Sequence, residues 1–128
     1  MTAERPERLG QEHRLTSPRQ FAAVQEAGVP FRGHHCVMLA LARPGESVRF
    51  GFIASRKGVG GAVQRNRARR RLREIVRRRR PRLPATGYWF VFIASRTAVT
   101  AAHQDLATDV EHLLARAGAL APTSLDLR

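Results

Sequence analysis

Two spacings of hydrophobic residues alternate along this chain of 128 residues. Three runs have the length and the apolar or alternating character of β-strands, in which successive side chains point to opposite faces. A shorter run contains Pro30, which cannot donate a ladder hydrogen bond and therefore favours the edge of a sheet. The predicted strands cover residues 29–32, 36–41, 48–55 and 88–95.

Other segments place apolar residues three or four positions apart, as on one face of an α-helix. Ser17, Pro18 and Gln20 form a helix start with a capping box. Phe21 and Val24 share one face of the helix that follows. The predicted helices run from Ser17 to near Gly28, over about 62–80 and over about 101–117.

In chain order the predicted elements are helix, three strands, helix, strand and helix, without an internal repeat. The economical packing is one domain over residues 15–118 in which helices pack against a single sheet. The turn Arg43-Pro44-Gly45-Glu46 indicates that the strands on either side of it pair antiparallel. If the third and fourth strands are parallel, their helical connection is expected to be right-handed. Residues 1–14 and 119–128 are predicted to be a flexible N-terminal segment and a C-terminal tail.

The helix predicted over about 62–80 carries an extreme charge. Between Arg65 and Arg82 the chain has eleven arginines and a single acid, Glu74. Like charges at i,i+4 repel, and a solvated helix face normally mixes both signs. The chain as a whole has a formal net charge of +13. A polyanion must accept this charge. Nucleic acid is favoured over a membrane surface, because the helix lacks the wide aromatic and leucine face of interfacial helices.

Helical geometry sorts the side chains of this segment by direction. Four apolar residues form the stripe that faces a sheet: Ala68, Leu72, Ile75 and Val76. Two lines then face outward, the first formed by Asn66, Arg70, Arg73 and Arg77 and the second by Arg67, Arg71 and Arg78, while Arg65 and Arg69 lie between the first line and the core. Asn66 can both donate and accept, so it could read a base edge or a 2′-hydroxyl. A helix N-cap is the open alternative for this residue.

Residue types that catalyse reactions are present but scattered. The five histidines do not share ligand spacing, and Cys36 lies in an apolar run without an activating neighbour. Asp105 and Asp109 read most simply as surface residues of the last helix. The glycine-rich segment 58–61 lacks the Gly-Lys-Ser/Thr of a nucleotide-binding loop and favours a tight turn over a phosphate cradle. We therefore expect neither a nucleotide cofactor nor metal chemistry by protein side chains alone.

Three features that the sequence lacks indicate the cellular compartment in which we expect the protein. The N-terminus has no apolar h-region, and no stretch is long enough to span a bilayer. The single cysteine excludes an intramolecular disulfide, which fits a reducing environment. We expect a cytoplasmic protein.

The segment from Arg65 to Glu74, preceded by the segment from Phe50 to Lys57, resembles the protein subunit of bacterial ribonuclease P. The similarity extends over about residues 13–117 and includes His13-Arg14-Leu15. Phe21, Gly28 and the strand from Tyr88 to Arg96 also match the family.

The resemblance implies an α+β fold, a two-layer α/β sandwich with the order α-β-β-β-α-β-α. Its sheet would be mostly antiparallel, with a left-handed crossover that carries the Arg-Asn-Arg helix. It also implies that an RNA subunit with bound magnesium ions cleaves the 5′ leader from precursor tRNA. The protein would bind the leader and favour those metal ions. Its partners would be the catalytic RNA and the precursor, with no membrane and no nucleotide cofactor.

The resemblance further implies roles for individual residues. Those matching the RNA-facing motif are Arg65, Asn66, Arg67, Arg69, Arg70 and Arg73, and the basic residues at strand ends are Arg56, Lys57 and Arg96. Phe21, Val37 and Leu39 match positions that line a cleft for single-stranded leader. Gln25 and Leu39 replace aromatics that are frequent in the family, so weaker base stacking is expected. Gly58 is an extra residue in the turn after Lys57, which would shift the phosphate-facing loop.

Two other functions compete with this interpretation. A structural RNA-binding protein, such as a ribosome component, would account for the charge and fold. It would not account for the Arg-Asn-Arg motif together with Phe21 and Lys57. A stand-alone nuclease would need a cluster of acids that the sequence does not show.

Overall fold

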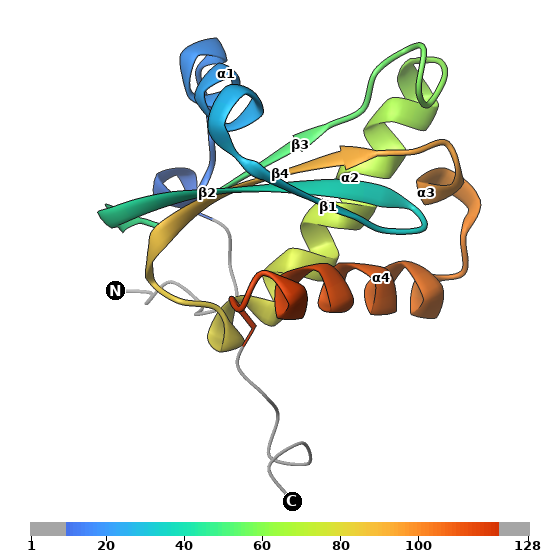
Figure 1. Cartoon of the computed structure of the whole chain (residues 1–128). Helices are drawn as coiled ribbons and strands as arrows, with labels where there is room; N and C mark the ends of the chain where they lie inside the picture. The colour runs from blue at the N-terminus through green and yellow to red at the C-terminus, as the bar shows by residue number, and fades with distance from the viewer. Residues whose placement is uncertain (1–9, 121–128) are drawn as a thin grey trace, which may run out of the picture.

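The structure is a computed structural model that describes residues 10–120 (Figure 1). Its centre is a sheet of four strands in the order β1 (Val29–Arg32), β2 (Cys36–Ser47), β4 (Thr86–Ala94) and β3 (Arg49–Ile53). β1 pairs antiparallel with β2 and β2 with β4, whereas β3 and β4 are parallel. All four predicted strands are therefore confirmed. The predicted flexible segment and tail lie largely outside the described residues.

The predicted antiparallel pair of β2 with β3 is wrong, because β4 lies between these two strands. The turn predicted at 43–46 is instead part of a longer β2, whose register with β4 shifts between Arg43 and Ser47. The sequence holds a signal for this arrangement. A strand that is buried on both faces forms a nearly continuous apolar run, and residues 88–94 form such a run. β4 thus takes the centre of the sheet.

The helices begin and end close to their predicted limits. The capping box at Ser17 is present, and its hydroxyl accepts the Gln20 N–H at 3.2 Å. The last predicted helix begins at His103, and a separate single turn that was not predicted, Thr97–Thr100, precedes it. The helices are α1 (Pro18–Ala27), α2 (Ala62–Arg79), α3 (Thr97–Thr100) and α4 (His103–Arg116), with short 3₁₀ turns at Gln11–His13 and Arg80–Arg82. No helix within residues 10–120 has the length and apolar character needed to cross a membrane.

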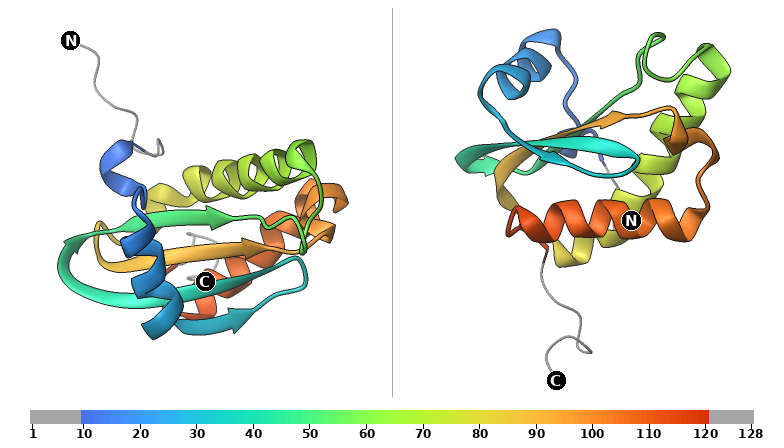
Figure 2. Two further views of the ribbon diagram at one scale, coloured as in Figure 1. Left: turned by 90° about the horizontal axis from the view of Figure 1, so that it is seen from above. Right: turned by 45° about the vertical axis from the view of Figure 1, so that its right-hand side comes forward.

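Helices cover both faces of the sheet (Figure 1). α2 and α4 pack on one face and complete the main two-layer sandwich, while α1 lies alone on the other face. Seen from above (Figure 2, left), β3 and β4 point the same way and α2 lies on the far side of the sheet from α1. The β3–α2–β4 crossover is therefore left-handed, and the right-handed default does not apply to this chain.

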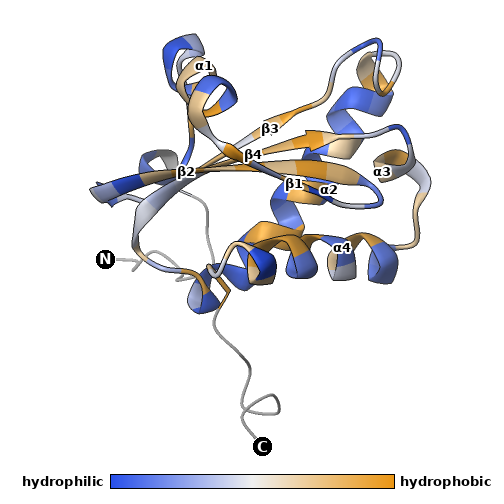
Figure 3. Cartoon of the chain, viewed as in Figure 1, coloured by the Kyte–Doolittle hydropathy of each residue, from blue (hydrophilic) through white to orange (hydrophobic). Residues whose placement is uncertain are grey.

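The larger core lies between the sheet and helices α2 and α4, where strands and inward helix turns are apolar (Figure 3). Phe50 stacks on Phe90 with ring centroids 5.6 Å apart, and Phe52 stacks on Phe92 at 5.7 Å. All four residues of the predicted apolar stripe of α2 are buried here. A smaller core lies under α1 and includes Leu15, Val24 and Leu39. The two cores fix α1 and α2 over opposite faces of the same sheet.

Part of the predicted N-terminal segment packs on the domain. The His13 ring hydrogen-bonds through Nδ1 to the Val48 carbonyl at 3.0 Å. Arg14 forms a parallel bridge with Phe50, and the Leu15 N–H donates to the Phe50 carbonyl at 3.0 Å. Residues 14–15 thus extend the sheet at the free edge of β3.

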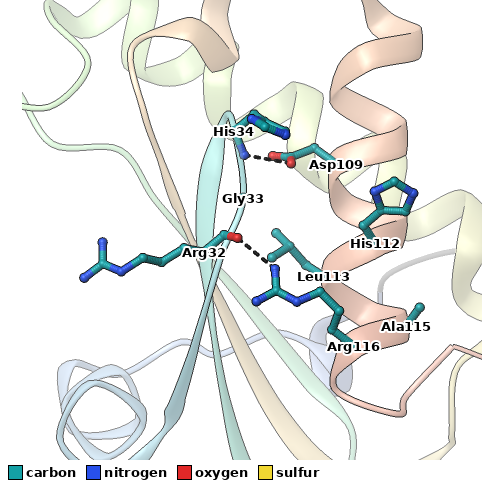
Figure 4. A pocket seen from close by; sticks show the side chains of 8 residues that line it. All are labelled: Arg32, Gly33, His34, Asp109, His112, Leu113, Ala115 and Arg116. Atoms are coloured by element: carbon teal, nitrogen blue, oxygen red, sulfur yellow. Dashed lines mark hydrogen bonds between the residues drawn. The ribbon is translucent and has the colours of Figure 1, made fainter.

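The prediction that Asp109 lies on the surface is wrong. Its side chain is buried, and its two carboxylate oxygens accept the backbone N–H groups of His34 and His35 at 2.8 Å each (Figure 4). Asp109 thereby holds the tip of the β1–β2 hairpin against α4. Gly33 permits this approach, since a Cβ atom there would lie 2.6 Å from an Asp109 oxygen. Burial, and then the nearby Asp109 carboxylate, raises the pKa of the Cys36 thiol, which keeps it protonated.

Candidate nucleic-acid interface

The arginines of α2 divide into those that bind other parts of the protein and those that do not. Arg67 donates through Nε to the Val99 carbonyl at 2.9 Å. Arg71 donates to the carbonyls of Ala98 and Val99, at 2.9 and 3.0 Å, and to that of Ala101. The last carbonyls of a helix have no hydrogen-bond donor within the helix, and the guanidinium groups of Arg67 and Arg71 are the donors for the carbonyls of α3. Arg67, which was matched to the RNA-facing motif, therefore also serves the protein's own structure.

The C-terminal half of α2 is partly neutralised by two glutamates. Glu74 accepts from Arg77 at 2.6 Å and from Arg78 at 3.1 Å. The hydrogen bond from Arg77 is the main cause that lowers the pKa of Glu74 to about 2, so this carboxylate is ionised at neutral pH. Glu111 on α4 binds Arg79 at 2.7 Å and Arg82 at 3.4 Å. The ion pairs of Glu74 lie within α2, and the ion pair of Arg79 with Glu111 joins α2 to α4.

Three other arginines of α2 lack such partners in the described part of the chain. Within residues 10–120, the side chains of Arg65, Arg70 and Arg73 form no hydrogen bond or ion pair with another residue. The Arg73 guanidinium stacks over the Phe52 ring at 5.6 Å. A hollow of about 410 Å³ opens among these side chains, lined by Val63, Asn66, Arg69, Arg70 and Arg73. We call it the α2 hollow. It combines guanidinium donors with one amide and suits a phosphate backbone.

Asn66 does not cap the helix, because α2 begins after Gly61 and Asn66 lies more than one turn inside it. Its Oδ1 accepts from Arg69 Nη2 at 2.5 Å, while its side chain remains exposed. The N-cap alternative is therefore wrong. The amide hydrogens of Asn66 remain available for a nucleotide.

A second hollow lies between α1, β3 and α2. It measures about 460 Å³, and its lining residues are Thr16, Ser17, Pro18, Phe21, Gln25, Phe52, Ile53, Ala54 and Arg69. We call it the α1–β3 hollow. The Phe21 ring lies directly on Gly51, where an added Cβ would be 2.4 Å from a ring carbon. Arg69 lines both hollows, so the two adjoin at this residue.

Two of the residues predicted to line a leader cleft do not line the α1–β3 hollow. Leu39 is buried in the core under α1, at 9% exposure, and does not line the α1–β3 hollow. Val37 is half-buried and separated from Ile53 by Ile93, which pairs with both residues in the sheet. Period-two alternation correctly places Val37 and Leu39 on the α1 face. It could not show that α1 covers Leu39, since that depends on where the helix crosses the sheet.

A family model described as Ribonuclease P matches residues 9–118. The chain belongs to the ribonuclease P protein family. The resemblance inferred from the Arg-Asn-Arg helix and the strand before it is thus confirmed. Membership makes this chain a protein component of ribonuclease P, an endoribonuclease complex.

Individual relatives agree with this assignment. A ribonuclease P protein component from Chloroflexus aurantiacus is 43% identical over 114 residues, covering 88% of this chain and 83% of the relative. One from Dehalococcoides mccartyi is 39% identical over 115 residues, covering 90% and 92%. The solved ribonuclease P protein of Thermotoga maritima has a TM-score of 0.70 at 26% identity, covering 80% of this chain and 96% of that one. The Staphylococcus aureus protein shares the fold, with a TM-score of 0.73 at 22% identity and coverage of 84% and 97%.

In this ribonuclease P protein the three basic residues predicted at strand ends follow the carboxyl ends of two neighbouring strands, β3 and β4. β3 and β4 are parallel neighbours with Ile53 opposite Ile93, so the loops that follow them begin side by side. Arg56 and Lys57 are exposed in the first loop and Arg96 in the second. Gly58 belongs to the first turn, where its N–H donates to Ser55 Oγ at 2.8 Å. The three basic side chains therefore extend the cationic surface beyond the start of α2.

Sequence reasoning missed Val63, which lines the α2 hollow and is 74% exposed. Its signal was available, because Val63 lies off the apolar stripe of a helix whose other outward residues are mostly arginine. An apolar side chain exposed among guanidinium groups offers a contact for a ribose or base.

Proposed function

We propose that this ribonuclease P protein is an RNA-binding subunit that assists a catalytic RNA in removing the 5′ leader of precursor tRNA. The observation that carries the proposal is the α2 hollow, whose Arg70 and Arg73 have no hydrogen-bond or ion-pair partner within residues 10–120, next to the α1–β3 hollow that Phe21 lines. Guanidinium groups neutralise phosphates and release counterions, which drives binding irrespective of sequence. The aromatic ring and Ile53 offer a surface on which an unpaired base can stack. Together they suit a single strand that leaves a folded RNA.

The proposal assigns the chemical step to the RNA subunit and its magnesium ions. Among the described residues, no three histidine, cysteine, aspartate or glutamate side chains come together as metal ligands would. No magnesium ligand is therefore assigned to this chain. Its contribution is positive potential, which favours the approach of substrate and of hydrated cations that accompany the RNA.

Reconstitution tests this function. The protein is combined with a bacterial ribonuclease P RNA and a precursor tRNA at low magnesium, and mature 5′ ends are counted over time. We expect cleavage at the correct site to be faster with the protein than without it. Binding of the RNA without stimulation would point to a structural RNA-binding protein instead. Cleavage by the protein without the RNA subunit would indicate a stand-alone nuclease.

Phe21→Ala should weaken holoenzyme binding to precursor tRNA more than binding to mature tRNA. Stacking of a base on an aromatic ring contributes about 1–3 kcal/mol, which corresponds to roughly 5- to 150-fold in affinity. Val24→Ala is the matched control, because Val24 is buried on the same helix and does not line the α1–β3 hollow. Equilibrium dissociation constants for the two tRNAs measure the effect. Equal losses for precursor and mature tRNA would contradict leader binding at Phe21.

A further inference from the structure

Arg14 lies at the free edge of β3, beside α2. Its backbone is held on both sides, by the bridge to Phe50 and by Arg49 Nη1, which donates to the Arg14 carbonyl at 3.1 Å. The next residue, Leu15, is buried in the core under α1. Successive side chains of an extended segment point to opposite faces, so the Arg14 side chain is directed toward the α2 face. Nothing in the sequence motif of α2 draws attention to this residue.

On the α2 face three arginines follow β3: Arg14 is bridged to Phe50, Arg73 stacks over the Phe52 ring, and Arg69 donates to the Ala54 carbonyl at 3.4 Å. Burial lowers the pKa of the Arg73 guanidinium below its ordinary value, and the charges of Arg14 and Arg69 lower that pKa further. The Nε atom of Arg73 is buried without a hydrogen-bond partner. Within residues 10–120 none of the three guanidinium groups forms an ion pair with a carboxylate. Three positive charges thus gather where the protein supplies no counter-charge, which favours a bound anion.

We propose that Arg14, Arg69 and Arg73 form a seat for one RNA phosphate between the α2 hollow and the α1–β3 hollow. Arg69 lines both hollows, so a strand that passes from one to the other crosses this point. Phosphodiester oxygens accept guanidinium N–H groups in charge-assisted hydrogen bonds. The inference rests on the proposed function and adds Arg14 as a residue that positions RNA. The phosphate comes either from the precursor leader or from the ribonuclease P RNA.

Arg14→Ala in the reconstituted holoenzyme tests the seat. Arg32→Ala is the control, because Arg32 is exposed on β1, at the opposite edge of the sheet, and its side chain points away from the neighbouring pocket (Figure 4). Three dissociation constants are measured across a salt series, for precursor tRNA, mature tRNA and the ribonuclease P RNA. We expect Arg14→Ala to weaken one RNA interaction about tenfold at low salt and to make its salt slope shallower by about 0.7–0.9. Arg32→Ala should change neither quantity.

The RNA whose dissociation constant changes identifies the source of the phosphate. Loss confined to precursor tRNA indicates a leader phosphate, and loss in assembly with the ribonuclease P RNA indicates a phosphate of that RNA. In a double-mutant cycle, Arg14→Ala and Arg73→Ala together should weaken binding less than the product of their separate effects, because both contact one phosphate. The melting temperature of free Arg14→Ala should stay the same or rise, since the variant removes a repulsion. A merely structural role would lower it.

The seat is rejected if Arg14→Ala matches Arg32→Ala in all three arms while the wild-type protein stimulates cleavage. In that case the proposed function stands without it. If the wild-type protein neither binds these RNAs nor stimulates cleavage, the proposed function fails, and the seat fails with it.

Discussion

Arg70→Ala combined with Arg73→Ala should lower the affinity for RNA about a hundredfold at moderate salt and leave the domain folded. Neither guanidinium forms a hydrogen bond or ion pair within residues 10–120, so the protein loses no internal contact of that kind. Each phosphate contact contributes about 0.7–0.9 to the salt slope, and the double variant should therefore reduce the slope by about 1.4–1.8. Dissociation constants measured from low to moderate salt give both quantities.

The matched control for this pair lies on the same helix. Arg67→Ala combined with Arg71→Ala removes the same formal charge but also the donors to three carbonyls in and just after α3, those of Ala98, Val99 and Ala101. This second pair should lower the melting temperature and affect the RNA affinity less than the first pair. An unchanged salt slope for the first pair, or equal effects of both pairs on affinity and melting, would show that the RNA-binding face of α2 is misassigned.

Asp109→Ala should destabilise the domain by about 3 kcal/mol. The carboxylate accepts two backbone N–H groups at 2.8 Å, and hydrogen bonds to charged groups contribute about 1.5–3 kcal/mol each. The variant leaves the His34 and His35 amides without their acceptors. For a domain of this size the melting temperature should fall by more than about 10 °C.

Asp105→Ala is the control for Asp109→Ala, because Asp105 is exposed in the first turn of the same helix. Its loss should change the melting temperature by no more than about 3 °C, the effect of one charge near a helix N-terminus. Thermal unfolding followed by circular dichroism compares the two variants. Similar melting temperatures for both would contradict the role of Asp109 in anchoring the β1–β2 hairpin.

Local patterns predicted the elements of this fold well, because they depend on neighbouring residues. The capping box at Ser17 and the apolar stripe of α2 are both formed as the sequence indicates. The buried position of Asp109 could also have been predicted from the sequence. It lies on the same helical stripe as Leu106, Val110 and Leu113, and an acid on such a stripe needs buried donors.

Contacts between distant segments were harder to predict. The turn after β2 is compatible with a hairpin, and only the competition for partners within the sheet places β4 between β2 and β3. Arg67 and Arg70 look equivalent in the sequence of α2, yet Arg67 donates to a carbonyl of α3, whereas Arg70 has no such partner among residues 10–120. Which arginines are available to RNA is therefore set by tertiary packing.

Site-directed cross-linking measures most directly whether RNA occupies the α2 hollow and the α1–β3 hollow. Cys36 is the only cysteine of the chain and is buried, so a single introduced cysteine can carry the photoreactive group. Val63→Cys and Gln25→Cys probe the two hollows, and Thr108→Cys on the exposed side of α4 is the control. In the reconstituted holoenzyme we predict cross-links to RNA from positions 63 and 25, with the precursor leader reached from position 25. Cross-links from position 108 alone, or equal yields from all three positions, would contradict the account.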